Sequence, residues 1–307
     1  MIKLRGIAKV AIGAVAAAAL TVPLAAPASA ETPPPEAPAG LTCFADMTRA
    51  DTEFPGTLRG VQYGSLPGSS AGGPGIDAFV NVNPVQHTGL GFNPKAIVKK
   101  NGHDSVLYAT SPSGTLYVVD GDDSTAVNKT WGGIRTMTDV VVTDKFDTAT
   151  GVTYTYAITD QGALMRYTQS KGVANMYGTV QVSPRGWWPL KGFSYWMTKP
   201  LSNGDQADVF LANAADGRLL EYTIPRATPT KWSSKVVRSA TWQNFVSFST
   251  GNCTDKTGNR IRTAPLLATT KTGDVWLYYV SKSSPDALPT VTQGTRVLTG
   301  FTNSYSG

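Results

Sequence analysis

Residues that commonly carry enzyme chemistry are scarce in this chain of 307 residues. It has two histidines, His87 and His103, and both lie in polar stretches typical of exposed loops. The Gly-x-Ser-x-Gly motif of a serine nucleophile is absent. The acidic run at 120–123 lacks the ligand spacing of a calcium loop. The composition therefore predicts neither a metal site nor a cofactor.

Glutamate is scarce as well. Beyond residue 30 the chain has only Glu31, Glu36, Glu53 and Glu221, and the first two lie in a proline-rich stretch. Glycoside hydrolases use two carboxyl groups beside the scissile bond. Several aspartates lie in predicted turns, where Asp is favoured for backbone reasons alone. The sequence therefore favours a protein that is not an enzyme.

Neither strong charge nor a long apolar run occurs beyond the N-terminus. Three of the 27 Lys and Arg residues lie in the first ten positions, which leaves 24 basic against 21 acidic residues. No basic run with interleaved aromatic residues appears, so nucleic acid is not an expected partner. No later stretch is apolar enough to span a bilayer, so we expect no membrane association of the mature chain.

The N-terminus predicts a signal peptide over 1–30. Basic residues are followed by an apolar stretch over 11–26 and by the small-residue cleavage site Ala28-Ser29-Ala30. Residues 31–41 form a proline-rich linker. We therefore expect a secreted, extracellular protein whose single folded domain covers 42–307.

A short motif recurs four times at intervals of about 50 residues. It consists of an apolar residue and alanine, four variable residues, glycine, and an aliphatic residue two positions later. Residues typical of strands flank turn residues in each copy, and the glycine supplies the positive φ of a short turn. Each copy therefore predicts a β-hairpin. The alanines are Ala109, Ala157, Ala212 and Ala268, and the glycines are Gly114, Gly162, Gly217 and Gly273.

Between the hairpins lies a second recurrent element, a bulky residue with an apolar residue three positions later. It is followed by an apolar run, so each unit holds about four strands, the content of a propeller blade. A degenerate first unit near 41–61 brings the number of units to five. The strand at 300–305 has no hairpin after it, and we expect it to close a ring by joining the first unit. The element occurs at Trp131/Ile134, Trp187/Leu190, Trp242/Phe245 and Leu298/Phe301.

Two cysteines are present, Cys43 in the first predicted unit and Cys253 in the last. An even count in a secreted protein favours a disulfide, and the two units are neighbours if the ring closes. The alternative is a pair of buried thiols. The polar surroundings of Cys253 favour the disulfide.

The segment Trp242-Gln-Asn-Phe245 and the hairpin over 106–117 resemble the blade motif of tachylectin-type five-bladed β-propeller lectins. The resemblance covers nearly all of 42–307. It implies an all-β propeller of four-stranded antiparallel blades that binds N-acetylated amino sugars near the blade junctions.

We expect repeated weak carbohydrate sites near the tryptophans of the second element. Their rings either offer apolar platforms to sugar faces or fill the wedge between sheets, and Trp276, on a hairpin strand, is expected in the core. The expected partners are extracellular glycans or cell-wall polysaccharide. The alternatives are a protein-interaction subunit of a secreted complex and, less favoured, a propeller glycosidase. The candidate ligand-binding residues are Trp131, Trp187, Trp188, Trp242, Asn93 and Asn244.

Overall fold

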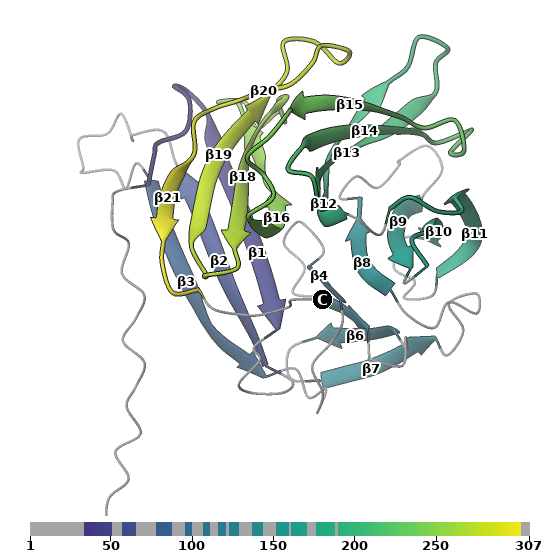
Figure 1. Cartoon of the computed structure of the whole chain (residues 1–307), viewed down its shortest axis with the longest axis horizontal. Helices are drawn as coiled ribbons and strands as arrows, with labels where there is room; N and C mark the ends of the chain where they lie inside the picture. The colour runs from purple at the N-terminus through teal and green to yellow at the C-terminus, as the bar shows by residue number, and fades with distance from the viewer. Residues whose placement is uncertain are drawn as a thin grey trace, which may run out of the picture.

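The fold consists of antiparallel β-sheets (Figure 1). The computed structural model describes residues 34–50, 57–65, 78–87, 96–99, 107–110, 116–120, 123–128, 137–143, 152–159, 161–170, 176–187 and 190–301. Within these ranges the regular structure is entirely strand, which confirms the predicted all-β class. The predicted signal peptide lies outside them. No helix in this part of the chain could cross a membrane.

The described strands form five sheets, and each sheet is built largely from consecutive strands. The first holds β1 (Thr42–Ala50), β2 (Thr57–Ser65), β3 (Ala78–His87) and β17 (Asn252–Thr254). The second holds β4 (Ala96–Lys99), β5 (Leu107–Thr110), β6 (Leu116–Asp120) and β7 (Asp123–Asn128). The third holds β8 (Met137–Val142), β9 (Val152–Thr159), β10 (Leu164–Ser170) and β11 (Met176–Ser183).

The last two sheets carry the candidate site. The fourth holds β12 (Leu190–Pro200), β13 (Gln206–Ala214), β14 (Leu219–Pro225) and β15 (Ser233–Arg238). The fifth holds β16 (Phe245–Thr250), β18 (Thr263–Thr270), β19 (Val275–Ser281) and β20 (Thr290–Val291), and β21 (Thr295–Leu298) also pairs with β19.

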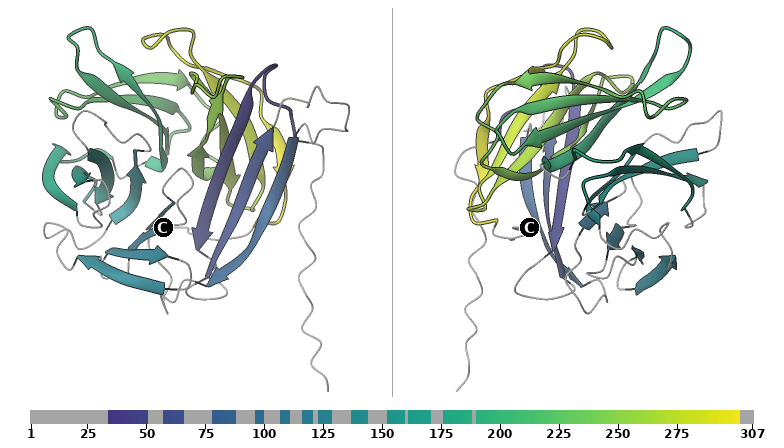
Figure 2. Two further views of the ribbon diagram at one scale, coloured as in Figure 1. Left: turned by 180° about the vertical axis from the view of Figure 1, so that it is seen from behind. Right: turned by 45° about the vertical axis from the view of Figure 1, so that its right-hand side comes forward.

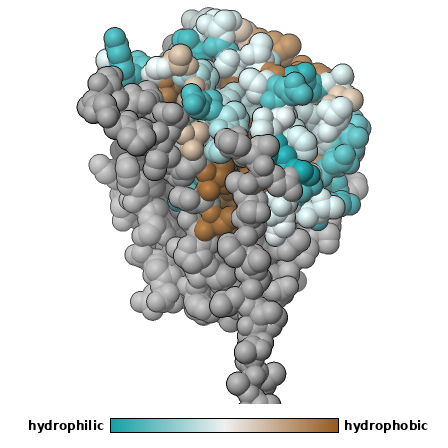
Figure 3. Space-filling model, turned by 90° about the vertical axis from the view of Figure 1, so that its left-hand side faces the viewer, coloured by the Kyte–Doolittle hydropathy of each residue, from teal (hydrophilic) through white to brown (hydrophobic). Residues whose placement is uncertain are grey.

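The five sheets lie around a common centre (Figures 1 and 2). Strand β4 contacts both β1 and β8, strand β12 contacts both β8 and β16, and β16 contacts β1. Each sheet therefore packs against its neighbours through its first strand. Figure 3 shows that the described surface beside β1–β3 and β21 is mostly polar or neutral, with small apolar areas.

The hairpin motif folds as its residues predict wherever the structure describes it. Gly162, Gly217 and Gly273 have φ values of 72°, 90° and 85°, the left-handed region that favours glycine. Ala157, Ala212 and Ala268 are fully buried on the strand before each turn. The small side chain allows the next sheet to approach closely.

Each turn glycine also fixes the start of the following unit. The N–H of Trp187 donates to the Gly162 carbonyl at 3.1 Å, and the N–H of Trp242 donates to Gly217 at 3.0 Å. The third such bond runs from Phe301 to Gly273 at 2.9 Å. Phe301 therefore takes the position of the tryptophans, and the predicted alignment of Leu298 with them is wrong.

The predicted disulfide is confirmed. Cys43 on β1 and Cys253 on β17 are direct cross-strand partners, buried and bonded across 210 residues. The bond joins the first sheet to a segment between two strands of the fifth, as neighbouring units require. The predicted pairing of 300–305 with the first sheet stays a prediction, because 302–307 lie outside the described residues. The strand that pairs with the free edge of β1 in the described part is β17.

Candidate ligand-binding site

Two neighbouring sheet junctions repeat one aromatic arrangement. At the junction of the third and fourth sheets, Trp187 packs on Tyr222 of β14, with ring centroids 4.5 Å apart. At the junction of the fourth and fifth, Trp242 packs on Tyr278 of β19 at 4.9 Å. Each tyrosine lies five residues after a motif glycine, and Tyr167 repeats that spacing. This periodic tyrosine is a sequence signal that the prediction did not use.

The tryptophans of these junctions belong to the core. Trp187 is 2% exposed and Trp242 is 3% exposed, so of the two alternatives for these rings the wedge-filling one holds for both. The physical reason is the wedge between two twisted sheets, which only a large side chain fills. Trp276, expected in the core, is only partly buried.

The other candidate residues fall into two groups. Asn244 is exposed in the turn between Trp242 and β16. Trp131, Trp188 and Asn93 lie outside the described residues. Ligand contacts by any of the six therefore remain predictions.

A cavity of about 220 Å³ lies at the junction of the fourth and fifth sheets, beside Trp242 and Tyr278. Arg238 closes one side from the end of β15, and the segment between β20 and β21 closes another. The lining residues are Arg238, Thr241, Trp242, Tyr278, Val291, Thr292, Gln293 and Gly294. The structure therefore joins one predicted residue, Trp242, to seven that sequence reasoning missed.

The two junctions differ in the segment that supplies a third ring. At the junction with the cavity it is Phe245, the first residue of β16, which lies 5.1 Å from Trp242 and 5.9 Å from Tyr278 between ring centroids. At the preceding junction, Trp232 lies 5.3 Å from Trp187 and 5.9 Å from Tyr222, between ring centroids. At the later junction Gly294 faces Tyr278, and a Cβ there would lie 2.4 Å from the tyrosine ring. Backbone thus covers part of Tyr278, and space remains beside it.

Thr241 adopts a backbone conformation that recurs at the junctions. Its φ is 80°, and Gly186 before Trp187 and Gly300 before Phe301 have φ values of 97° and 70°. Among the described residues Thr241 is the only non-glycine with positive φ, which for a β-branched residue costs of order 1–3 kcal/mol. The conformation places Thr241 directly before Trp242 at the cavity wall.

The polar groups of the cavity are oriented by bonds to the main chain. Arg238 donates from its guanidinium to the Val291 carbonyl. The Thr292 hydroxyl accepts from the Tyr279 N–H at 2.8 Å. Burial raises the pKa of Tyr278 to about 12, partly opposed by the charge of Arg238, so its hydroxyl is a neutral hydrogen-bonding group at pH 7. Gln293 is exposed at the rim with an amide donor and acceptor.

The lining can hold a small polar ligand. Partly buried Tyr278 presents apolar surface, to which Trp242 and Val291 add only a little, since they are 3% and 8% exposed. Arg238 and Gln293 present hydrogen-bonding groups. Within the described ranges no group of three or more His, Cys, Asp or Glu side chains could hold a metal ion.

No protein-family model and no curated protein matches the chain. Among solved structures, AofleA from Arthrobotrys oligospora is similar at 11% identity over 83% of this chain and 72% of that one, with a TM-score of 0.45. A variant of the Aleuria aurantia lectin in complex with alpha-methyl-L-fucoside has 12% identity over 83% and 78%, with a TM-score of 0.42. The BP39L lectin from Burkholderia pseudomallei has 12% identity over 85% and 87%, with a TM-score of 0.39. At these values the likeness assigns neither a ligand nor a site to this chain.

Proposed function

We propose that this chain is a secreted carbohydrate-binding protein without catalytic activity, and that a sugar ring binds in the cavity beside Trp242 and Tyr278. The observation that carries the proposal is the lining of that cavity, where aromatic surface and oriented polar groups converge. Its volume of about 220 Å³ is below the range of roughly 300–1,000 Å³ typical of drug-sized ligands. It suits one small ring.

A sugar offers apolar C–H faces beside hydroxyl groups, and this cavity offers matching surfaces. Tyr278 and Trp242 are amphipathic, with an apolar ring and a polar tip. Arg238 supplies donors, and the Gln293 amide supplies both a donor and an acceptor. Val291 gives apolar contact to a methyl group, which supports N-acetylated amino sugars as the first candidates.

Binding without hydrolysis is supported by the same lining. None of the residues that line this cavity is Asp or Glu. Hydrolysis of a glycosidic bond commonly needs two such groups on either side of the bond.

The arrangement and compartment form part of the proposal. The cyclic contacts of β1, β4, β8, β12 and β16 support a closed five-bladed propeller. The Cys43–Cys253 disulfide supports an extracellular location, because disulfides persist in oxidising compartments. The proposed partner is then a glycan or polysaccharide outside the producing cell.

The test is calorimetric titration of the mature chain with N-acetylglucosamine, alpha-methyl-L-fucoside and glucose. Tyr278→Phe and Gln293→Ala each remove hydrogen-bonding groups from the cavity, and we expect each to weaken binding of the preferred sugar by about tenfold. The matched control is Tyr222→Phe, which changes the equivalent tyrosine at the junction that Trp232 fills. If both variants, Tyr278→Phe and Gln293→Ala, bind the sugar with the same affinity as the wild type, the cavity is not the sugar site. If the chain releases product from a glycan, the assignment as a non-catalytic protein is wrong.

A further inference from the structure

A second cavity, of about 330 Å³, lies at the other end of the same junction. The cavity beside Trp242 lies near the start of β12, where Leu190 pairs with Ala214 close to the Gly217 turn that binds the Trp242 N–H. The second cavity borders the last residues of β12. Its lining comes from three segments of the fourth and fifth sheets: Met197, Thr198, Lys199, Pro200, Arg260, Ile261, Arg262 and Pro285.

Three of the lining side chains are cationic and none is acidic. Arg260 is held in place because its Nη2 donates to the Trp196 carbonyl at 2.8 Å. Arg262 is exposed, and its guanidinium makes no hydrogen bond or ion pair with another described residue. Lys235 adds charge nearby, since its Nζ donates to the Asp286 carbonyl at 3.2 Å.

Lys199 has an unusual counter-ion. Its side chain is only 7% exposed, and its Nζ lies 2.9 Å from Oδ1 of Asp286, whose side chain is 82% exposed. The charged partner of the buried ammonium is therefore a carboxylate that extends into solvent, and the Lys199 Nζ also donates to the Pro285 carbonyl at 3.5 Å. Pairing with an exposed carboxylate is weak, so another anion can replace it at little cost.

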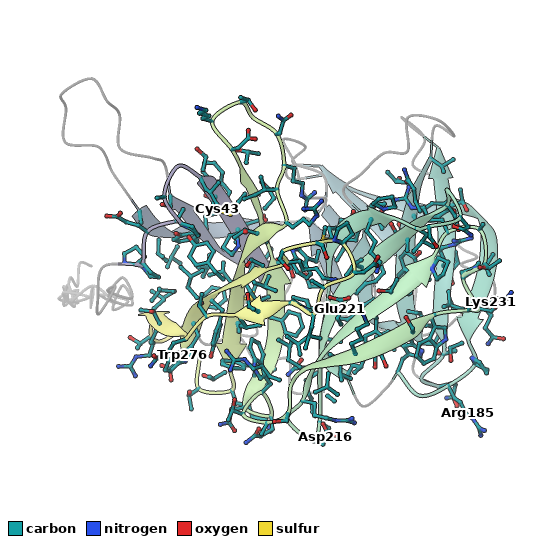
Figure 4. The ribbon with its side chains drawn as sticks, turned by 90° about the horizontal axis from the view of Figure 1, so that it is seen from above. Cys43, Arg185, Asp216, Glu221, Lys231 and Trp276 are labelled. Atoms are coloured by element: carbon teal, nitrogen blue, oxygen red, sulfur yellow. A yellow bond between two sulfur atoms is a disulfide. The ribbon has the colours of Figure 1, made fainter. Side chains whose placement is uncertain are left out.

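A second lysine of the same junction shows the contrast. Lys282 and Glu221 form an ion pair at 2.7 Å in which both side chains are fully buried, with exposed fractions of 0% and 1%. Figure 4 shows Glu221 in the interior, between the sheets. That pair is closed to solvent, whereas the pair of Lys199 and Asp286 is open on the side of Asp286.

We propose that the cavity beside Lys199 binds an oxyanion, namely a carboxylate or phosphate group carried by a saccharide. While the ligand is absent, the Asp286 carboxylate pairs with the Lys199 ammonium in its place. Asp286 shows which chemistry the ammonium accepts, a carboxylate approaching from solvent. Arg260 and Arg262 supply the additional charge-assisted contacts that such a group requires. The proposal that a saccharide carries the anionic group rests on the proposed function, whereas the proposal that the cavity binds an oxyanion does not.

The experiment titrates the full mature chain with inorganic phosphate, glucuronate, glucose 6-phosphate and glucose in low-salt buffer. Arg262→Gln should weaken binding of glucuronate and glucose 6-phosphate by about tenfold, because one charge-assisted contact is lost. Asp286→Asn should strengthen binding several-fold, because it removes the internal competitor. Arg185→Gln, an exposed change at the far edge of the molecule in Figure 4, removes the same charge and should have no effect.

Lys199→Met should abolish binding, and its melting temperature is measured separately because that side chain is buried. Unchanged or weaker binding by Asp286→Asn overturns the competitor role. An equal loss in Arg185→Gln and Arg262→Gln overturns the site, because it shows attraction by net charge alone. Glucose 6-phosphate that binds no better than inorganic phosphate overturns the saccharide part. Glucuronate binding that survives when N-acetylglucosamine, alpha-methyl-L-fucoside and glucose all fail to bind contradicts the sugar site beside Trp242 and Tyr278 and leaves the oxyanion site standing.

Discussion

The two described junctions on either side of the fourth sheet use one aromatic arrangement with different outcomes. Trp187 and Tyr222 are covered by Trp232, whereas Trp242 and Tyr278 adjoin Gly294 and a cavity. The repeated part of the arrangement, a tryptophan on a tyrosine, holds neighbouring sheets together. The variable part, the segment that leads into the outer strand, decides whether a junction is filled or open to a ligand.

The junctions also differ in their buried charges. Asp208 accepts hydrogen bonds from Arg226 at 2.8 and 3.0 Å and from Tyr156 at 2.9 Å, between the third and fourth sheets. The junction of the fourth and fifth sheets has the closed pair of Glu221 and Lys282. Each closed network stabilises its junction only while both partners are present.

The largest expected effect comes from Asp208→Ala. Removal of this carboxylate leaves the buried Arg226 charge without its main partner, which should lower the free energy of unfolding by about 3–5 kcal/mol. Chemical denaturation measures the change. The control is Asp216→Ala, which breaks an exposed ion pair with Arg218 and should cost about 0–1 kcal/mol. Similar losses in the two variants would show that Arg226 finds other partners.

Gly294→Ala should have the next largest effect. The added Cβ would lie 2.4 Å from the Tyr278 ring, so the ring or the backbone must move, at a cost of about 1–3 kcal/mol. Sugar affinity should fall as well, because the cavity changes shape. Ser234→Ala is the matched control, since Ser234 is the cross-strand partner of Tyr222 at the filled junction. An unchanged melting temperature in Gly294→Ala would contradict the close approach of the Gly294 backbone to the Tyr278 ring.

Trp232→Ala tests the comparison from the filled side. Trp232 is only partly buried, so its removal should cost roughly 1–2 kcal/mol and expose the rings of Trp187 and Tyr222. The near-ultraviolet circular dichroism of the clustered rings should change. If the signal and the melting temperature both stay at their wild-type values, Trp232 does not fill that junction.

The smallest effect concerns the open pair of Lys199 and Asp286. The hydrogen bond from Lys199 lowers the pKa of Asp286, so this pair adds stability above the ordinary Asp pKa of about 3.9 and loses it as pH falls through the lowered value. The difference in unfolding free energy between wild type and Asp286→Asn should therefore be small at pH 7 and vanish in acid. A difference that grows in acid would contradict the pairing.

The sequence predicted what local chemistry determines. The turn glycines require positive φ, the alanines allow close packing, and the cysteines fall in neighbouring units, so the hairpins and the disulfide could be anticipated. The burial of Trp187 and Trp242 was one of two alternatives that the sequence left open, because the choice between them depends on how far neighbouring sheets close around each ring. The cavity was missed because it depends on Gly294, whose position follows no repeat, and on how closely the backbone there approaches Tyr278.

The strand β17 was missed for a related reason. The segment around Cys253 is polar and short, and it becomes a strand only because β1 of the first sheet offers an edge to pair with. Pairing between segments about 210 residues apart is a tertiary effect that local propensity does not report. The periodic tyrosines at 167, 222 and 278 were a usable signal, since each follows its motif glycine by the same interval.

The most direct test of the difference between the junctions is a nuclear magnetic resonance titration that follows the tryptophan indole N–H signals as N-acetylglucosamine is added. The open cavity predicts that the Trp242 signal shifts with saturation, while the signal of Trp187, covered by Trp232, stays in place. A shift of Trp187 without Trp242, or no shift of Trp242 at saturating sugar, would contradict the assignment of the cavity as the sugar site.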